Sequence, residues 1–383
     1  VFETVLPGTA ELVWPLDGLN TFNEPQTLRW IQPYSSVQLL GNKVYFGTDP
    51  NPPLLYDGLD EQWTTGSLAY GTTYYWKVVS YTANGESQDV PLWSFSIVGE
   101  NQLAESFEGE QLPPVGWGWD HSYSWSRVMG AAFHGNFNIF RSAGDVSRKI
   151  HTPLVSVDAS SALSFAAFAS HDHLKAQVYY STNKASWLTA GSEIDLITGV
   201  WNNYNVSLNA IPAGDYYLAI GIYRGEGATT GNVALDHIIG PDIVPVVPAI
   251  AHSPSPPDGS EWVAPSTGLS WLPGIAGGIP DGYKVYLGTN GGGVTTPTNL
   301  VNGNIVTQYS FDIPFTLDEN TLYYWQIVPT NSAGDAPNCP IWSFSTFPNN
   351  AVQIGFGDED WTDLPIDVDY AYSYTQSIYL QQE

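Results

Sequence analysis

The residue types that could carry catalytic chemistry are scattered along this chain and form no complete set. Asp120, His121 and Ser122 are the types found in hydrolase triads, but adjacent residues in an extended chain point to opposite sides. The sequence has no Gly-x-Ser-x-Gly elbow and no His-Glu-x-x-His helix. Glycosidases need two carboxylates in one cleft, and no motif singles out a pair among the 38 acids. We therefore expect that the protein is not an enzyme.

Two other groups of side chains are of types that bind ligands. His171 and His173 are two residues apart, so on a strand they share a face and would offer two imidazoles to a transition metal; a solvated strand end is the alternative. Trp117, Trp119 and Trp125 are the best candidates for a sugar-stacking surface, with core packing as the alternative.

Composition restricts the class of protein. The formal net charge is −27, although only 13% of residues are charged, where about 25% is usual. An acidic surface of this kind repels phosphate backbones, so we expect no nucleic-acid partner. No apolar run is long enough to span a membrane, and one cysteine, Cys339, excludes an internal disulfide framework. Few lysines, many aromatics and a pI near 4.2 favour a secreted or cell-surface bacterial protein.

Short alternating runs between Gly and Pro residues indicate β-strands. Tyr74–Tyr81 and Tyr216–Tyr223 are rich in aromatic and β-branched residues and are bounded by turn residues. The Ala-rich stretch 162–174 would tolerate a helix, but its alternation favours strands. Many short strands with frequent turns are typical of sandwiches or barrels.

Several motifs occur twice, once near each end of the chain. The first copies are Leu28–Trp30, Lys43–Thr48, Tyr74–Trp76 and Trp93–Ser96, and the second copies are Leu269–Trp271, Lys284–Thr289, Tyr323–Trp325 and Trp342–Ser345. The turn Asp17-Gly18 likewise recurs as Asp258-Gly259. Two copies this far apart are separate domains, because solenoids repeat every ~20–50 residues.

Each copy resembles a bacterial fibronectin type III domain. In the second copy the resemblance rests on the strand ending in Trp271, the strand 283–289, the strand and turn 321–334, and the closing motif 342–345. It implies sandwiches of about seven strands at 9–98 and 248–347, with most Trp and Tyr side chains in their cores.

The segment between the two copies differs in composition and resembles another family. It holds most of the Lys and Arg residues and all but one of the 7 histidines. Its motifs occur in the order found in cleaved-adhesin or choice-of-anchor modules, which are related to jelly rolls and MAM domains. They are Glu105–Gly109, Leu112–Trp117, Ile150–Leu154, Ala213–Ala219 and Val233–Ile238. The resemblance implies a jelly-roll-like sandwich at 105–243.

This second resemblance also implies a metal. In that family the Glu of the opening strand and the Asp of the closing strand tend to meet at a cation, which gives Glu108 and Asp236 here, with Asn136 or Asn138 adding an oxygen. Ca²⁺ takes about 6–8 oxygen ligands, and its role here would be structural. The alternative is that both acids are solvated or cap turns.

The last segment, 351–383, resembles the opening of a further anchor-type module. A few strands alone are marginal in water, so this segment must pack on something. One hypothesis is strand addition to a neighbouring copy through Tyr372, Tyr374, Ile378 and Leu380; the alternative is that the segment folds back on its own domain.

The sequence therefore predicts an all-β fold: fibronectin type III-like, jelly-roll-like and fibronectin type III-like sandwiches plus a C-terminal β fragment. The function expected is that of a non-catalytic adhesin or surface-fibre subunit; the alternative is a carbohydrate-binding accessory region of a larger secreted hydrolase or protease. Expected partners are other copies, surface proteins and glycans. No Lys or Arg follows Lys284, so the acidic end of one copy would attract basic patches on the middle segment of another.

Overall fold

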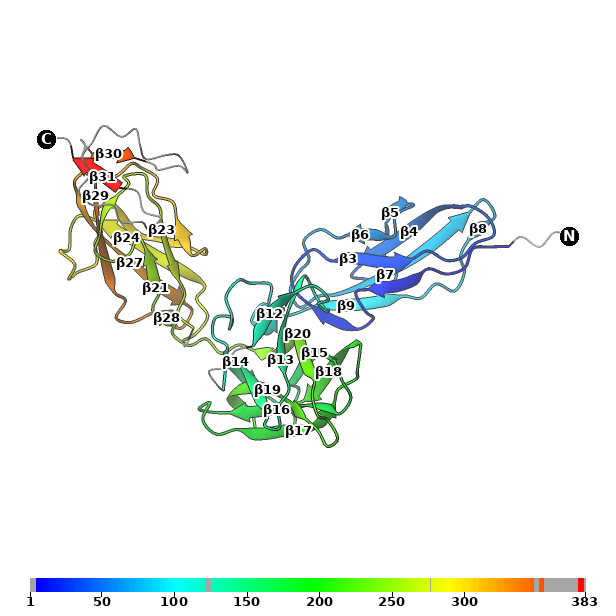
Figure 1. Ribbon diagram of the computed structural model, residues 1–383. Coiled ribbons are helices and arrows are strands. Elements are labelled where there is room, and N and C mark those ends of the chain that lie inside the picture. Colours follow the sequence, from blue (N-terminus) through cyan, green and yellow to red (C-terminus); the bar gives the residue numbers. More distant parts are fainter. Residues whose placement is uncertain (1–4, 121–124, 276, 348–350, 355–377, 382–383) are drawn as a thin grey trace, which may run out of the picture. The chain divides into compact units, whose positions relative to one another are not determined.

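The protein is built from β-strands. The computed structural model describes residues 5–120, 125–275, 277–347, 351–354 and 378–381, and every regular element in these ranges is a strand (Figure 1). The all-β prediction is confirmed. No described segment forms a helix that could span a membrane. The chain divides into two compact units, one of residues 1–112 with 119–244 and the other of residues 113–118 with 245–383. The predicted domain limits stay predictions.

The first sandwich has two sheets. Its strands are β1 (Glu11–Trp14), β2 (Leu19–Thr21), β3 (Thr27–Ile31), β4 (Leu39–Gly47), β5 (Leu54–Gly58), β6 (Gln62–Thr64), β7 (Thr73–Thr82), β8 (Gly85–Glu86) and β9 (Trp93–Ile97). One sheet has the order β1-β3-β6, and the other has the order β2-β9-β7-β4-β5 with β8 beside β7. Strand β2 runs parallel to β9, whereas the neighbouring β7–β9 pair is antiparallel.

Both sheets bury alternate residues in one core. Trp30 of β3 and Trp76 of β7 are 2% and 0% exposed, and Phe46 of β4 stacks on Tyr74 with ring centroids 5.2 Å apart. Each large apolar side chain buried in this way contributes about 2–3 kcal/mol. The aromatic excess in the sequence therefore serves the core here.

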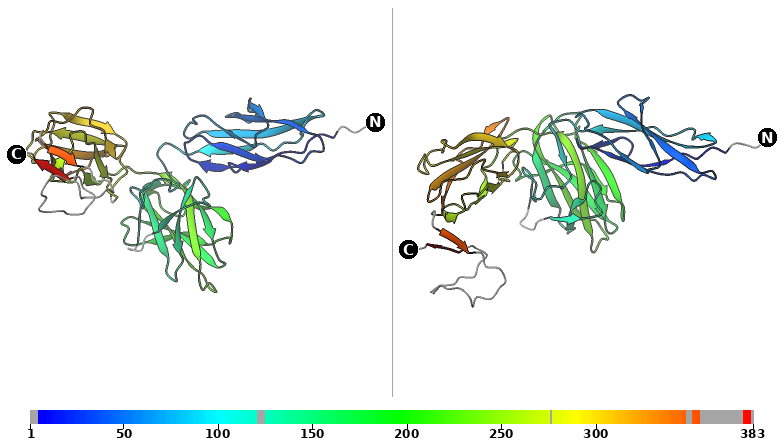
Figure 2. Two further views of the ribbon diagram at one scale, coloured as in Figure 1. Left: turned by 45° about the horizontal axis from the view of Figure 1, so that its top comes forward. Right: turned by 90° about the horizontal axis from the view of Figure 1, so that it is seen from above.

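The second sandwich lies in the same unit. Its strands are β10 (Gln102–Glu105), β11 (Gly118–Trp119), β12 (Ser126–Met129), β13 (Phe137–Ser142), β14 (Arg148–Val157), β15 (Ala162–Ala169), β16 (Leu174–Ser181), β17 (Leu188–Asp195), β18 (Trp201–Ser207), β19 (Gly214–Arg224) and β20 (Asn232–Asp242). One sheet has the order β12-β13-β20-β15-β18, with β10 beside β20, and the other has the order β11-β14-β19-β16-β17. Figure 2 shows these two layers.

The Ala-rich stretch forms strands, as the alternation predicts. Ala166, Ala167 and Ala169 of β15 are almost fully buried beside β20. Consecutive buried residues show that both faces of β15 are covered near Ala166 and Ala167, and pairing with β18 and β20 holds the strand extended.

The second unit contains the third sandwich. Its strands are β21 (His252–Ser255), β22 (Ser260–Val263), β23 (Leu269–Leu272), β24 (Gly282–Gly288), β25 (Val301–Val306), β26 (Ser310–Phe311), β27 (Leu322–Asn331), β28 (Gly334–Asp335) and β29 (Ile341–Thr346). The orders β21-β23-β26 and β22-β29-β27-β24-β25 repeat the topology of the first sandwich. A separate pair, β30 (Ala351–Ile354) with β31 (Ile378–Gln381), completes the described chain.

The repeat extends to single hydrogen bonds. In the first sandwich, Asp17 Oδ1 accepts a bond from the Ser94 N–H at 2.8 Å, and in the third, Asp258 Oδ1 does the same with Ser343 at 2.8 Å. The glycine after each Asp has φ of 73°, a conformation that favours glycine. Each opening turn is thus fastened to the last strand of its own sandwich.

Candidate functional site

The two acids predicted to bind calcium hold one loop of the second sandwich. Asp236 in β20 is fully buried; its Oδ2 accepts the backbone N–H of His134 at 2.8 Å and its Oδ1 accepts that of His237 at 2.6 Å. Glu108 Oε1 accepts the N–H of Asn136 at 3.0 Å and that of the following residue at 2.8 Å. Both carboxylates therefore receive backbone donors from the loop at 134–137.

Calcium at these acids stays a prediction, and the structure shows other partners for both of them. N–H groups bond to both oxygens of Asp236 and to one of Glu108, and Asn136 contributes its backbone N–H rather than a side-chain oxygen. Burial raises the pKa of Asp236 to about 7, although the hydrogen bonds from backbone N–H groups act in the opposite direction. In the described ranges, no group of three or more His, Cys, Asp or Glu residues is placed to hold a metal. Both acids stabilise a loop, and chelation tests the metal directly.

The three tryptophans proposed as a sugar-stacking surface do not form one. Trp117 is 4% exposed and Trp125 is 1% exposed, and only Trp119, in β11, is partly exposed. Large aromatic rings beside a sheet gain more from burial than from solvent contact, and core packing, the alternative considered from the sequence, describes two of the three.

Of the residues predicted for assembly, Tyr372 and Tyr374 lie outside the described residues. Ile378 and Leu380 lie in β31, where they are paired with Ile354 and Val352 of β30 in the same chain. Strand addition to another copy stays a prediction.

Basic side chains of the second sandwich have partners within the chain. The Lys175 ammonium lies 3.0 Å from Glu193 and 3.3 Å from Asp195. The Lys184 ammonium lies over the ring of Tyr217, 4.2 Å from its centroid. The second sandwich thus has less unpaired positive charge for an acidic partner than its composition alone indicates.

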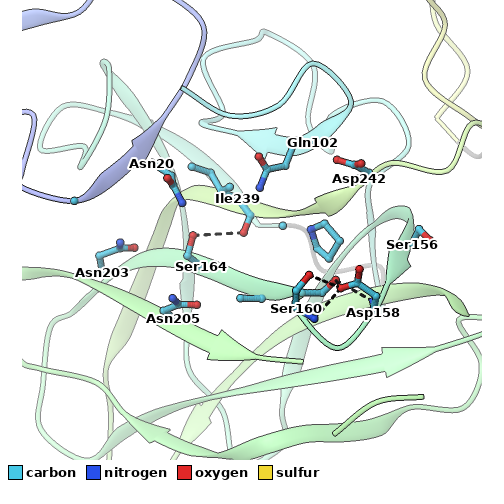
Figure 3. Close-up of a pocket in the computed structure, with 15 residues that line it drawn as sticks. Asn20, Gln102, Ser156, Asp158, Ser160, Ser164, Asn203, Asn205, Ile239 and Asp242 are labelled. Atoms are coloured by element: carbon cyan, nitrogen blue, oxygen red, sulfur yellow. Dashed lines mark hydrogen bonds between the residues drawn. The ribbon is translucent and has the colours of Figure 1, made fainter. Parts of the chain in front are cut away.

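A polar pocket of about 510 Å³ opens in the first unit and is the strongest candidate for a ligand site (Figure 3). It gathers the amides of Asn20, Gln102, Asn203 and Asn205. Four serines, at 156, 160, 161 and 164, and the carboxylates of residues 158 and 242 also line it.

Three adjacent strands form one wall of the pocket. The register of β18, β15 and β20 places Asn205 opposite Ser164, and Ser164 opposite Ile239. The Ser164 hydroxyl donates to the Ile239 carbonyl at 3.4 Å. Asn203 lies two residues from Asn205 on the edge strand β18, so both amides share a face, and both are exposed. The pairing thus aligns a row of hydrogen-bonding groups toward solvent.

A turn between β14 and β15 contributes a carboxylate to the pocket. Asp158 Oδ1 accepts bonds from the Ser160 N–H at 2.9 Å, the Ser160 hydroxyl at 2.8 Å and the Ser161 hydroxyl at 2.9 Å. These hydroxyls lower the pKa of Asp158, which therefore carries its charge at neutral pH. Asp242 of β20 lies opposite Gln102 of β10 and adds a second acid.

The lining consists mainly of neutral polar groups, with two carboxylates among them. Among the described residues that form it there is no His, Cys, Lys, Arg, Tyr or Trp, so it offers neither a Ser–His or Cys–His pair nor a cationic group. Amides, hydroxyls and carboxylates together donate and accept hydrogen bonds, which matches a ligand rich in hydroxyl groups.

Sequence reasoning did not find this pocket. Its residues come from segments far apart in the chain, and no short motif joins them. One signal was available: Asn203 and Asn205 alternate with Tyr204 and Val206 in a strand pattern, which puts two amides on one face.

No family model matches the chain, and no curated protein matches it. Among solved structures, it is similar to carbohydrate-binding modules of the β-sandwich superfamily, with 15% identity, a TM-score of 0.31, and coverage of 62% of this chain and 98% of that one. A tandem of two such modules from Paenibacillus barcinonensis shows 13% identity and a TM-score of 0.29 over 62% of this chain and 77% of that one. The chicken CNTN1 FN1–FN3 domains show 10% identity and a TM-score of 0.20 over 89% of this chain and 100% of that one.

Proposed function

We propose that this chain is a non-catalytic glycan-binding protein of the bacterial cell exterior, in which β-sandwiches present the polar pocket of the first unit to a carbohydrate. The observation that carries the proposal is the concentration of four amides, four serines and two acids around one pocket of about 510 Å³. Sugars satisfy such groups because each hydroxyl both donates and accepts hydrogen bonds.

The charge of the pocket favours uncharged sugars. Asp158 and Asp242 are its charged side chains among the described residues, and the whole chain has a net charge of −27. A uronate or sialate would bring a further negative charge to an acidic surface, and like charges reduce both affinity and association rate. We therefore propose neutral oligosaccharides as the ligand class.

A glycan-binding pocket serves either setting expected from the sequence. In an accessory region it keeps a hydrolase near its substrate, and in an adhesin it attaches a surface protein to a glycan. The described lining holds no Ser–His or Cys–His pair, which supports the accessory role or an adhesin over a hydrolase of that type at this pocket.

A glycan screen with paired variants tests the proposal. The double variant Asn203→Ala/Asn205→Ala removes two pocket amides from the edge strand β18. Its matched control is Asn302→Ala/Asn304→Ala, two exposed amides on β25, the edge strand of the third sandwich. Each lost hydrogen bond costs about 0.5–1.5 kcal/mol, so the pocket variant should bind about tenfold more weakly and the control should bind like the wild type.

The measurement is isothermal titration calorimetry with the tightest neutral glycan of the screen, alongside uronate-containing and sialylated glycans. Binding by no glycan, or equal binding by the pocket variant and the control, would overturn the proposed function. Preference for an acidic glycan would overturn the ligand class alone.

A further inference from the structure

One pocket amide belongs to a different sandwich from the others. Asn20 lies in β2 of the first sandwich, whereas Asn203 and Asn205 lie in β18 of the second. Gly18, in the turn before β2, also lines the pocket. Figure 3 shows the Asn20 side chain on the same side of the pocket as Asn203 and Ser164. The ligand site is therefore formed where the two sandwiches meet.

A direct hydrogen bond joins the sandwiches at this residue. The backbone carbonyl of Asn20 lies 2.7 Å from Nε2 of His237 in β20. His237 is 1% exposed and has φ of 49°, in the left-handed region that is uncommon for residues other than glycine. The backbone N–H of His237 donates to Asp236, and this bond helps to fix the position of the imidazole that contacts Asn20.

An aromatic contact lies beside this bond. The ring of Phe22, two residues after Asn20, lies 4.6 Å from the ring of His134 and 4.9 Å from that of His237. The carboxylate of Glu24 lies 2.9 Å from Nε2 of His134. Phe22 lies outside the core cluster of the first sandwich, and its ring contacts His134 and His237 of the second. These side chains serve the junction rather than the fold of either sandwich.

We propose that the glycan site is shared between the two sandwiches, with Asn20 as a ligand-contacting residue and Phe22 as a positioning residue that sets where Asn20 stands. This rests on the proposed function of the pocket. Loss of the Phe22 ring should loosen the junction, so that binding must first restore the position of Asn20. The side chains of the second sandwich that line the pocket remain as they are.

Three single variants of the full chain separate these roles. Asn20→Ala removes the amide but keeps the carbonyl that His237 contacts. Phe22→Ala removes the junction ring but no pocket side chain, and Phe22→Tyr restores a ring. Phe315→Ala, at a phenylalanine that is 38% exposed in the third sandwich, is the matched control.

Affinity electrophoresis in soluble xylan, mixed-linkage β-glucan, galactan and mannan identifies the tightest probe, which calorimetry then quantifies. Asn20→Ala and Phe22→Ala should each weaken binding about five- to tenfold. Phe22→Tyr and Phe315→Ala should bind like the wild type. Thermal unfolding of each variant should stay close to that of the wild type, which separates positioning from loss of fold.

The outcomes distinguish the two proposals. If Asn203→Ala/Asn205→Ala weakens binding while Asn20→Ala and Phe22→Ala do not, the site belongs to the second sandwich alone and the shared site is refuted, although the proposed function stands. If Phe22→Tyr fails to restore affinity, the positioning role of the ring is refuted. If none of the four glycans binds the wild type, neither proposal holds for these ligands.

Discussion

The acid stability of the second sandwich should depend on one buried imidazole. His151 in β14 is 9% exposed, and its ring stacks on Trp187 with centroids 5.9 Å apart. Burial lowers its pKa from 6.5 to about 4, and the Lys184 ammonium adds to the lowering. Because the folded pKa lies below the unfolded one, the stability from the neutral ring is complete above about pH 6.5 and is lost as the pH falls toward 4.

The size of the effect follows from the two pKa values. Each pKa unit corresponds to 1.36 kcal/mol, so acidification from neutral pH to about pH 4 should remove about 3 kcal/mol of folding free energy through this ring. Domains are stable by only about 5–15 kcal/mol, so the loss should be easy to measure.

The variant His151→Phe isolates the contribution, because it keeps an aromatic ring against Trp187 and cannot take up a proton. Urea unfolding of both proteins at about pH 7.5 and about pH 4 should show that the wild type loses about 3 kcal/mol more than the variant. An NMR titration of the His151 ring gives its pKa independently. The reasoning would be refuted if both proteins lost the same unfolding free energy between the two pH values, or if the His151 ring titrated near 6.5.

Three further predictions concern the loop, the metal and the C-terminal segment. Asp236→Ala leaves the buried N–H groups of His134 and His237 without an acceptor, so the free energy of unfolding in urea should fall by about 2–5 kcal/mol. A fall below about 1 kcal/mol would contradict the role of Asp236 in holding the loop. Chelation with EDTA should leave the melting temperature unchanged, since the N–H groups bonded to Asp236 hold the loop without a metal; a fall that calcium reverses would support the predicted metal site. Strand addition predicts that deleting residues 351–383 abolishes assemblies seen by negative-stain microscopy, and unchanged assemblies would argue against it.

The fold could be predicted because its signals are local and repeated. In the strand Tyr74–Tyr81, the residues Tyr74, Trp76 and Val78 share a face, and β7 buries all three, while Tyr75 and Lys77 between them are partly exposed. The motifs shared by the two copies return as β4 and β24, β7 and β27, and β9 and β29, in the same sheet order. Such patterns determine the strands and the core without knowledge of distant contacts.

The candidate site could not be predicted in this way. Asn20, Gln102 and Asn205 converge only because β20 pairs with β10 and with β15, and because the first sandwich lies against His237. Residue type alone was also misleading for Trp125, which is 1% exposed. A tryptophan next to polar residues looks the same in sequence whether it stacks on a sugar or fills a core.

The parallel pairing of β2 with β9, and of β22 with β29, has a mechanical consequence. In the first and third sandwiches, an early strand and the last strand run side by side in the same direction. Tension that reaches these two strands from opposite ends of the sandwich pulls them past each other, so that their hydrogen bonds must break together rather than one after another. The bond from Asp17 to Ser94, repeated between Asp258 and Ser343, adds to this clamp. The first and third sandwiches are thereby suited to resist extension along these strands.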